Sequence, residues 1–153
     1  MKKIKIGING FGRIGRTLFR LLINHPSIEV VAINDLAPAK TLAHLLKYDS
    51  IHGVLDTDVI GLDHAIMIAK KTVPVFNEAA IESISWQDTG AEIIIEATGK
   101  FKRKSMLSLH LKGQVKRVIL AAPPEEDNIP MIIMGINELT LKNSDQIISN
   151  ASC

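Results

Sequence analysis

Apolar and polar residues change their spacing near the start of the chain. Ile4, Ile6 and Ile8 alternate with other residues, which predicts a β-strand over residues 4–8. The glycine-rich stretch NGFGRIG, residues 9–15, then interrupts the alternation. Apolar residues recur after it at helical spacing, which predicts an amphipathic helix over residues 13–23. The chain therefore opens with a strand, a glycine turn and a helix.

Later apolar runs predict a sheet. We expect its further parallel strands at residues 28–34, 92–96, 115–120, 131–134 and 146–148. Helices are expected at 39–48, at 104–112 before Gly113, and, as short turns, at 81–86 and at 138–142 after a capping Asn137. Residues 49–53 are expected to form a loop, and residues 65–69 and 73–76 short antiparallel strands. This order predicts an α/β fold with a doubly wound, mostly parallel six-stranded sheet and a small antiparallel appendage.

Composition limits the class of protein. The 153 residues are enough for one domain, which would bury about 70% of its unfolded surface. Apolar residues make up 46% of the chain and aromatic residues 4%, which fits an aliphatic core around a parallel sheet. The net charge of +2 gives no reason to expect binding to membranes or nucleic acids. One cysteine, no long apolar span and no secretory leader pattern lead us to expect a cytoplasmic protein.

The glycine stretch has the spacing G-x-G-x-x-G. In a turn between strand and helix, Gly10 would permit the tight turn, Gly12 would let the backbone approach a pyrophosphate, and Gly15 would let the helix pack on the strand. The helix N-terminus would then offer N–H groups to a phosphate. Taken alone, the spacing is equally compatible with a purely structural turn.

A carboxylate further along the chain favours dinucleotide binding. Asp35 ends the apolar run 28–34 and follows Gly15 by twenty residues. A Rossmann unit places there the acid that binds the adenosine ribose hydroxyls. Because the carboxylate also repels a 2′-phosphate, the sequence predicts NAD rather than NADP as the cofactor. No metal site is predicted.

Small, polar or turn residues follow each predicted parallel strand, and open parallel sheets bind ligands beyond those strand ends. Thr98 and Gly99 follow the run 92–96 and are candidates for facing the cofactor, with an ordinary strand-to-helix turn as an equal alternative. Trp86, the only tryptophan, is expected to be a packing anchor. The basic cluster that begins at Lys100 is better explained as the solvated start of a helix than as a phosphate or nucleic-acid patch.

The last residue is a candidate nucleophile. Cys153 follows the predicted strand 146–148 in the sequence SNASC. A lone cysteine is usually a small core residue. Beside a nicotinamide, however, a thiolate can attack an aldehyde, and the hemithioacetal then donates a hydride to NAD and becomes a thioester. None of the five histidines is expected beside this strand end, so no general base is predicted.

Four segments together resemble one enzyme family. INGFGRIGR, HLLKYDSIHG, ATGKF and SNASC are similar to phosphorylating glyceraldehyde-3-phosphate dehydrogenase, over the whole length from Ile4 to Cys153. The similarity is to the family's N-terminal cofactor domain only. It implies that the backbone of Arg13 and Ile14 holds the pyrophosphate and that Asp35 binds the ribose. It also implies that positions 98 and 99 contact the cofactor.

The same resemblance implies a reaction. Cys153 matches the catalytic nucleophile, and Ser152 matches a position that lines the substrate pocket. The family oxidises glyceraldehyde 3-phosphate with NAD and inorganic phosphate to 1,3-bisphosphoglycerate in glycolysis, and the full-length protein is expected to be a homotetramer. Two positions depart from the family: Ala79 and Ala121 stand where polar cofactor contacts are frequent. Each such hydrogen bond contributes ~0.5–1.5 kcal/mol, so we expect weaker NAD binding but not its loss.

The resemblance further implies a second, catalytic domain that this chain lacks, with the histidine base, the phosphate-binding residues and the tetramer contacts. We therefore expect a single NAD-binding domain over residues 1–153, inactive by itself, with an exposed apolar groove that favours self-association. Two alternatives stay open. One is a fragment of erythrose-4-phosphate dehydrogenase, which shares the glycine and cysteine motifs, and the other is a non-catalytic NAD-binding module.

Overall fold

A computed structural model describes residues 2–151. The strands are β1 (Ile4–Asn9), β2 (Ile28–Asn34), β3 (Tyr48–Asp49), β4 (Gly53–Val54), β5 (Val59–Gly61), β6 (Ala65–Ile68), β7 (Lys71–Phe76), β8 (Ile93–Glu96), β9 (Arg117–Leu120) and β10 (Ile147–Ser149). The α-helices are α1 (Arg13–Leu22), α2 (Ala39–Lys47) and α3 (Lys104–Leu107). Four 3-10 turns complete the list: η1 (Ile81–Ser83), η2 (Trp86–Asp88), η3 (Ser108–His110) and η4 (Glu138–Thr140).

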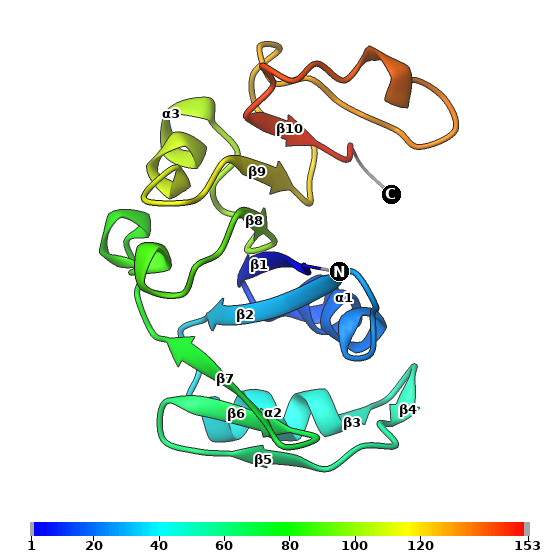
Figure 1. The fold of residues 1–153 in the computed structure, drawn as a ribbon, viewed down its shortest axis with the longest axis vertical. Coiled ribbons are helices and arrows are strands. Elements are labelled where there is room, and N and C mark those ends of the chain that lie inside the picture. The colour runs from blue at the N-terminus through cyan, green and yellow to red at the C-terminus, as the bar shows by residue number, and fades with distance from the viewer. Residues whose placement is uncertain (1, 152–153) are drawn as a thin grey trace.

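Eight strands form one sheet in the order β10-β9-β8-β1-β2-β7-β6-β5 (Figure 1). The strands from β10 to β7 run parallel, whereas β6 pairs antiparallel with both β5 and β7. The chain leaves the central β1 towards β2 and β7 on one side, then returns to build β8, β9 and β10 on the other. This is the strand order of a Rossmann fold, so the predicted doubly wound α/β architecture is confirmed.

Apolar residues cover both faces of the sheet. One buried cluster includes Phe19 of α1 and Leu42 of α2, and a second includes Trp86 of η2 and Leu107 of α3. The neighbouring residues Ala32 and Ile33 of β2 belong to different clusters, because side chains alternate between the faces of a strand. Trp86 is fully buried, and its ring lies edge-on to Phe76 with centroids 6.0 Å apart. Its predicted role as a packing anchor is confirmed.

Six parallel strands were expected and six are present, but one of them is a different segment. The predicted strand 131–134 is wrong: within the described residues it makes only one isolated bridge, from Met131 to Ser149. The Asn137 side chain accepts the Ile133 N–H and donates to the Met131 carbonyl, which curls this segment into a turn. The sixth strand is β7, which was expected to be wholly antiparallel but also pairs parallel with β2.

The predicted helices after α2 are shorter in the structure. The helix expected at 104–112 is α3 followed directly by η3, whose tighter turn ends with Leu111 N–H donating to Ser108. The segments 81–86 and 138–142 contain 3-10 turns only, and the Asn137 side chain makes no capping bond to η4. No helix within residues 2–151 is long and apolar enough to span a membrane.

The expected loop 49–53 lies within a small hairpin of β3 and β4. Asp49 closes its turn by accepting the N–H groups of Ile51 and His52, and these bonds hold the pKa of this carboxyl below its usual 3.8. The Arg20 guanidinium of α1 donates to the carbonyls of Leu46, at the end of α2, and of Gly53 in β4. Arg20 thereby joins both helices and the hairpin.

Candidate functional site

A pocket of about 240 Å³ opens beyond the carboxyl ends of β1, β2 and β8. Here the chain switches from one half of the sheet to the other, and open parallel sheets bind ligands at such a point. The lining residues are Asn9, Gly10, Gly12, Asn34, Asp35, Leu36, Glu78, Ala79, Ala97, Thr98, Lys100 and Phe101.

The three glycines of the loop between β1 and α1 serve different purposes. Gly10 has φ +91°, and a Cβ atom there would lie 2.6 Å from the Thr98 nitrogen. A Cβ atom on Gly15 would collide with the Gly10 carbonyl oxygen. A Cβ atom on Gly12 would meet nothing within 4 Å. Packing therefore requires the first and third glycines, while the second leaves space on the pocket side of the loop.

The N-terminus of α1 lies at this loop with its first amide groups uncapped. Gly12 is the N-cap, no side chain within residues 2–151 bonds to the first turn, and that turn contains no acidic residue. Its unpartnered N–H groups and the positive end of the helix dipole suit a phosphate. Arg13 and Ile14 are exposed in this turn, although neither side chain lines the pocket.

Asp35 lines the pocket and also holds the glycine loop. One carboxylate oxygen accepts the Phe11 N–H at 2.7 Å, and the other accepts the Ala37 N–H at 2.9 Å. Each oxygen retains acceptor capacity for a further donor, such as a ribose hydroxyl. The predicted ribose-binding acid thus lies beside the glycine loop.

Thr98 and Gly99 follow β8 on the opposite wall. Thr98 lines the pocket, whereas Gly99 is exposed beside it, with φ +73° and no atom within 4 Å of its Cβ position. The Thr98 N–H donates to a carboxylate oxygen of Glu96 at 2.9 Å, and the Thr98 hydroxyl accepts the Lys100 N–H. The turn is therefore ordered by Glu96, a residue that sequence reasoning had not singled out.

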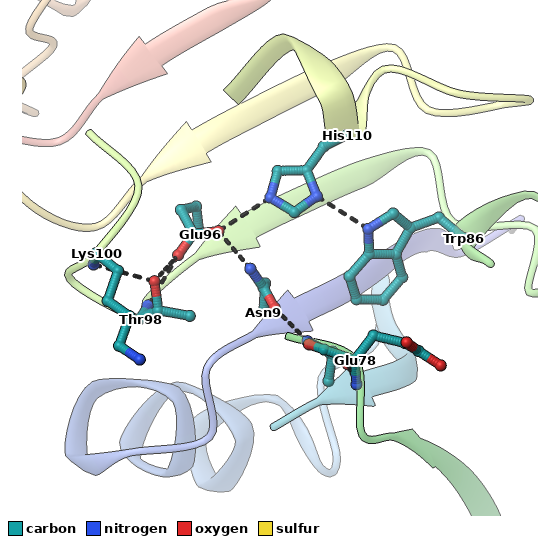
Figure 2. A network of polar contacts seen from close by, with 8 residues as sticks. Asn9, Glu78, Trp86, Glu96, Thr98, Lys100 and His110 are labelled. Carbon is teal, nitrogen blue, oxygen red and sulfur yellow. Dashed lines mark hydrogen bonds and ion pairs between the residues drawn. The ribbon is translucent and has the colours of Figure 1, made fainter. Parts of the chain in front are cut away.

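Glu96 belongs to a buried polar row that crosses three strand ends (Figure 2). Asn9 donates from its amide to Glu96 at 2.5 Å, and Asn34 donates to Asn9 at 2.7 Å. Asn34 also accepts the N–H of Glu78, which lies in the pocket wall after β7. The sequence feature that could have predicted this row is the polar residue at the end of each apolar strand, in IKIGIN, IEVVAIN and IIIE.

The structure brings four of the predicted site residues into the pocket lining: Gly10, Gly12, Asp35 and Thr98. Of the two positions that depart from the family pattern, Ala79 lines the pocket and Ala121 does not. Ser152 and Cys153 lie outside the described residues. Within residues 2–151, no three histidine, cysteine, aspartate or glutamate residues are grouped so that they could bind a metal ion.

A second hollow, of about 280 Å³, lies at the opposite edge of the sheet. Phe19, Val30 and Val73 contribute to its largely apolar lining. Two of the cations beside it already have partners, because Lys71 pairs with Glu29 and Lys3 donates to a backbone carbonyl. The pocket at the carboxyl edge, whose lining includes Asp35, Thr98 and Lys100, is the better candidate for a ligand site.

Comparison with known proteins identifies the family. Residues 4–104 match the family model for the glyceraldehyde 3-phosphate dehydrogenase NAD-binding domain. The chain belongs to this family. It is 47% identical over 150 residues to glyceraldehyde-3-phosphate dehydrogenase 1 of Bacillus cereus, and 45% identical over 152 residues to the enzyme of Mycoplasma pneumoniae. These alignments cover 97% and 99% of this chain but 45% of each relative, so the chain spans about half the length of the curated relatives that it matches.

The cofactor of this glyceraldehyde 3-phosphate dehydrogenase domain is NAD. The pocket suits it in three respects: uncapped amides at the start of α1, an open Cα face at Gly12, and a carboxylate at Asp35.

The glycine assignments predict different effects for two matched substitutions. Gly15→Ala forces a methyl group against the Gly10 carbonyl and should lower the free energy of unfolding by about 1–3 kcal/mol. Gly12→Ala meets open space and should change it by less than about 0.5 kcal/mol. Urea unfolding followed by circular dichroism measures both. Equal stability of the two variants would contradict this account of the loop.

Proposed function

We propose that the chain is the cofactor half of a phosphorylating glyceraldehyde-3-phosphate dehydrogenase. The observation that carries this proposal is the pocket at the switch point of the sheet, with an uncapped helix N-terminus on one wall and Asp35 beside it. The similarity to glyceraldehyde-3-phosphate dehydrogenase 1 of Bacillus cereus and of Bacillus subtilis supports glyceraldehyde 3-phosphate as the substrate. These names also favour glyceraldehyde 3-phosphate over erythrose 4-phosphate.

We place the cofactor from the residues that could hold each part of it. The pyrophosphate would lie at the backbone of Gly12, Arg13 and Ile14, where the positive end of α1 is uncapped. The adenosine ribose would bind Asp35, whose oxygens have acceptor capacity left. Thr98 and Gly99 would contact the cofactor from the β8 side, and the nicotinamide would extend towards the end of β10.

We assign the chemistry to the residues after β10, where Cys153 and Ser152 follow in the sequence. The Cys153 thiolate would add to the aldehyde carbon of the substrate and form a hemithioacetal, with Ser152 lining the substrate pocket. NAD, when bound, supplies the acceptor for the hydride that this carbon loses as it becomes a thioester. Inorganic phosphate would then attack the thioester, which releases the thiolate and 1,3-bisphosphoglycerate. We further propose that the whole protein is a homotetramer that acts in glycolysis in the cytoplasm.

Titration of the chain with NAD tests the cofactor site. Wild-type chain should bind NAD, and Gly12→Val should weaken binding by at least about tenfold, or about 1.4 kcal/mol, because its side chain occupies the space left for the pyrophosphate. Isothermal titration calorimetry measures the affinity, and circular dichroism shows that the variant is folded. Leu21→Val is the matched control, because Leu21 is exposed on the same helix and lies outside the pocket. Equal NAD affinity in the wild type and Gly12→Val would show that the pyrophosphate does not bind beside Gly12.

Asp35 should set the preference between the two dinucleotides. Asp35→Asn keeps a side-chain acceptor near the glycine loop but removes the charge that repels a 2′-phosphate. We expect the ratio of NADP to NAD affinity to rise by about tenfold. Asp88→Asn neutralises an exposed acid that lies outside the pocket and should leave this ratio unchanged. If both variants change the ratio of NADP to NAD affinity equally, Asp35 does not set the preference between the two dinucleotides.

The chain should be inactive by itself. None of the described residues that line the pocket is a histidine, and the only buried histidine within residues 2–151, His110, is bonded to Trp86 and Glu96. An assay of NADH absorbance with NAD, glyceraldehyde 3-phosphate and phosphate should give no signal above the blank. Glyceraldehyde-3-phosphate dehydrogenase 1 of Bacillus subtilis serves as the positive control. Turnover that disappears in Cys153→Ser would overturn this expectation.

A further inference from the structure

Glu96 is a fully buried carboxylate at the last position of β8. Four donors converge on its two oxygens: the Asn9 amide, the His110 ring, and the N–H and hydroxyl of Thr98. Burying an acidic side chain is costly unless its oxygens are paired, and here each oxygen meets two donors. The carboxylate is therefore the common acceptor of a strand, a loop and a helical turn.

The two oxygens serve different walls of the cofactor pocket. Oε1 accepts both groups of Thr98, on the β8 side. Oε2 accepts the Asn9 amide, and Asn9 in turn accepts from Asn34, which holds the Glu78 backbone after β7. Glu96, Asn9 and Asn34 are register partners across β8, β1 and β2. The row therefore links the two sides of the pocket through the final residues of three neighbouring strands.

The far end of the network fixes the orientation of the donor on His110. The Trp86 indole N–H can only donate, so His110 Nδ1, 2.9 Å away, accepts. The proton of the neutral ring is then on Nε2, which donates to Glu96 Oε2 at 2.9 Å. Trp86 and His110 are fully buried and do not line the pocket.

We propose that Glu96 is a positioning residue for NAD: its buried carboxylate fixes Thr98 on one wall of the pocket and, through Asn9 and Asn34, the Glu78 backbone on the other. This inference rests on the cofactor placement proposed above. Glu96 does not itself line the pocket, so it acts through the residues that do. Because hydrogen bonds to a charged acceptor are among the stronger ones, the row holds the walls at a set separation before the cofactor arrives.

Replacing one acceptor oxygen by a donor tests this role. Glu96→Gln keeps the shape of the side chain, but its NH₂ group must face two donors, either those of Thr98 or those of Asn9 and His110. We expect the NAD affinity of the folded variant to fall by about tenfold or more. Calorimetry measures the affinity, and thermal unfolding measures the stability of the same sample.

Exchanging the amide at position 9 and the carboxylate at position 96 tests whether NAD binding can be restored. Asn9→Asp alone places two carboxyl groups in contact, whereas Asn9→Asp combined with Glu96→Gln restores one amide and one carboxylate with the polarity reversed. The amide introduced at position 96 then donates to the carboxylate introduced at position 9, and the amide oxygen can still accept from Thr98. The His110 N–H still faces the NH₂ group, so the rescue is partial. We expect the double variant to bind NAD more tightly than either single variant. Glu96→Asp, which keeps the charge but retracts it by one methylene group, should weaken binding by about tenfold.

Val118→Ala is the matched control for a merely structural role. Val118 is fully buried in the same core cluster as Trp86 but makes no hydrogen bond to Glu96 and does not line the pocket, so this variant leaves all four donors to Glu96 in place. It should lower the unfolding temperature and leave NAD affinity within about twofold of the wild type. A fall in affinity as large as that of Glu96→Gln would mean that binding follows stability, and would overturn the proposal.

The remaining outcomes separate this inference from the proposed function. If the wild-type chain fails to bind NAD, both the proposed cofactor placement and the proposed role of Glu96 are refuted. If the wild type binds NAD and folded Glu96→Gln or Glu96→Asp binds it equally well, only the role of Glu96 is refuted. Loss of folding in Glu96→Gln, Glu96→Asp and the double variant would make Glu96 a determinant of folding alone, and would likewise refute the proposal.

Discussion

A carboxylate inside a parallel sheet has to be matched by donors, and much of this domain is arranged around that requirement. Glu96 has no exposure to solvent, and its partners come from β1, from the turn after β8 and from η3. The tight 3-10 turn that ends the α3 segment places His110 in the core, and Trp86 holds the outer nitrogen of its ring. The polar row therefore lies where three strands end, and it orders the turn by which the chain leaves β8.

The glycine loop combines two kinds of constraint that look alike in the sequence. Gly10 and Gly15 are enclosed by backbone, so any side chain there would collide with the fold itself. A Cβ atom on Gly12 would contact no described residue, so this glycine leaves open space beside the uncapped start of α1. Asp35 adds to this arrangement, because its carboxylate binds the Phe11 amide and so shapes the loop without any cofactor.

Sequence patterns predicted elements with strong periodicity well and weakly patterned elements poorly. The strand, turn and helix from β1 to α1, and the following β2 and α2, agree with the prediction to within a residue or two. Residues 131–134 are as apolar as a strand, yet the Asn137 side chain takes the backbone groups that a neighbouring strand would need. Residues 71–76 form β7, which pairs parallel with β2. The sequence did not predict this pairing, because it depends on which strand lies at the edge of the sheet when β7 joins it. A short apolar run reports burial but does not specify its partner.

The amino-acid sequence by itself determined the α/β class, the glycine turn before a helix, the acid at position 35 and, through its resemblance, the dehydrogenase family. These follow from local spacing and from residue types at fixed separations, which a linear pattern records directly. Only the tertiary structure decided that Asn9, Asn34 and Glu96 form one hydrogen-bonded row and that His110 and Trp86 complete it. The reason is physical: such a row depends on the register between strands that are far apart in the chain, and register is settled only when the sheet assembles.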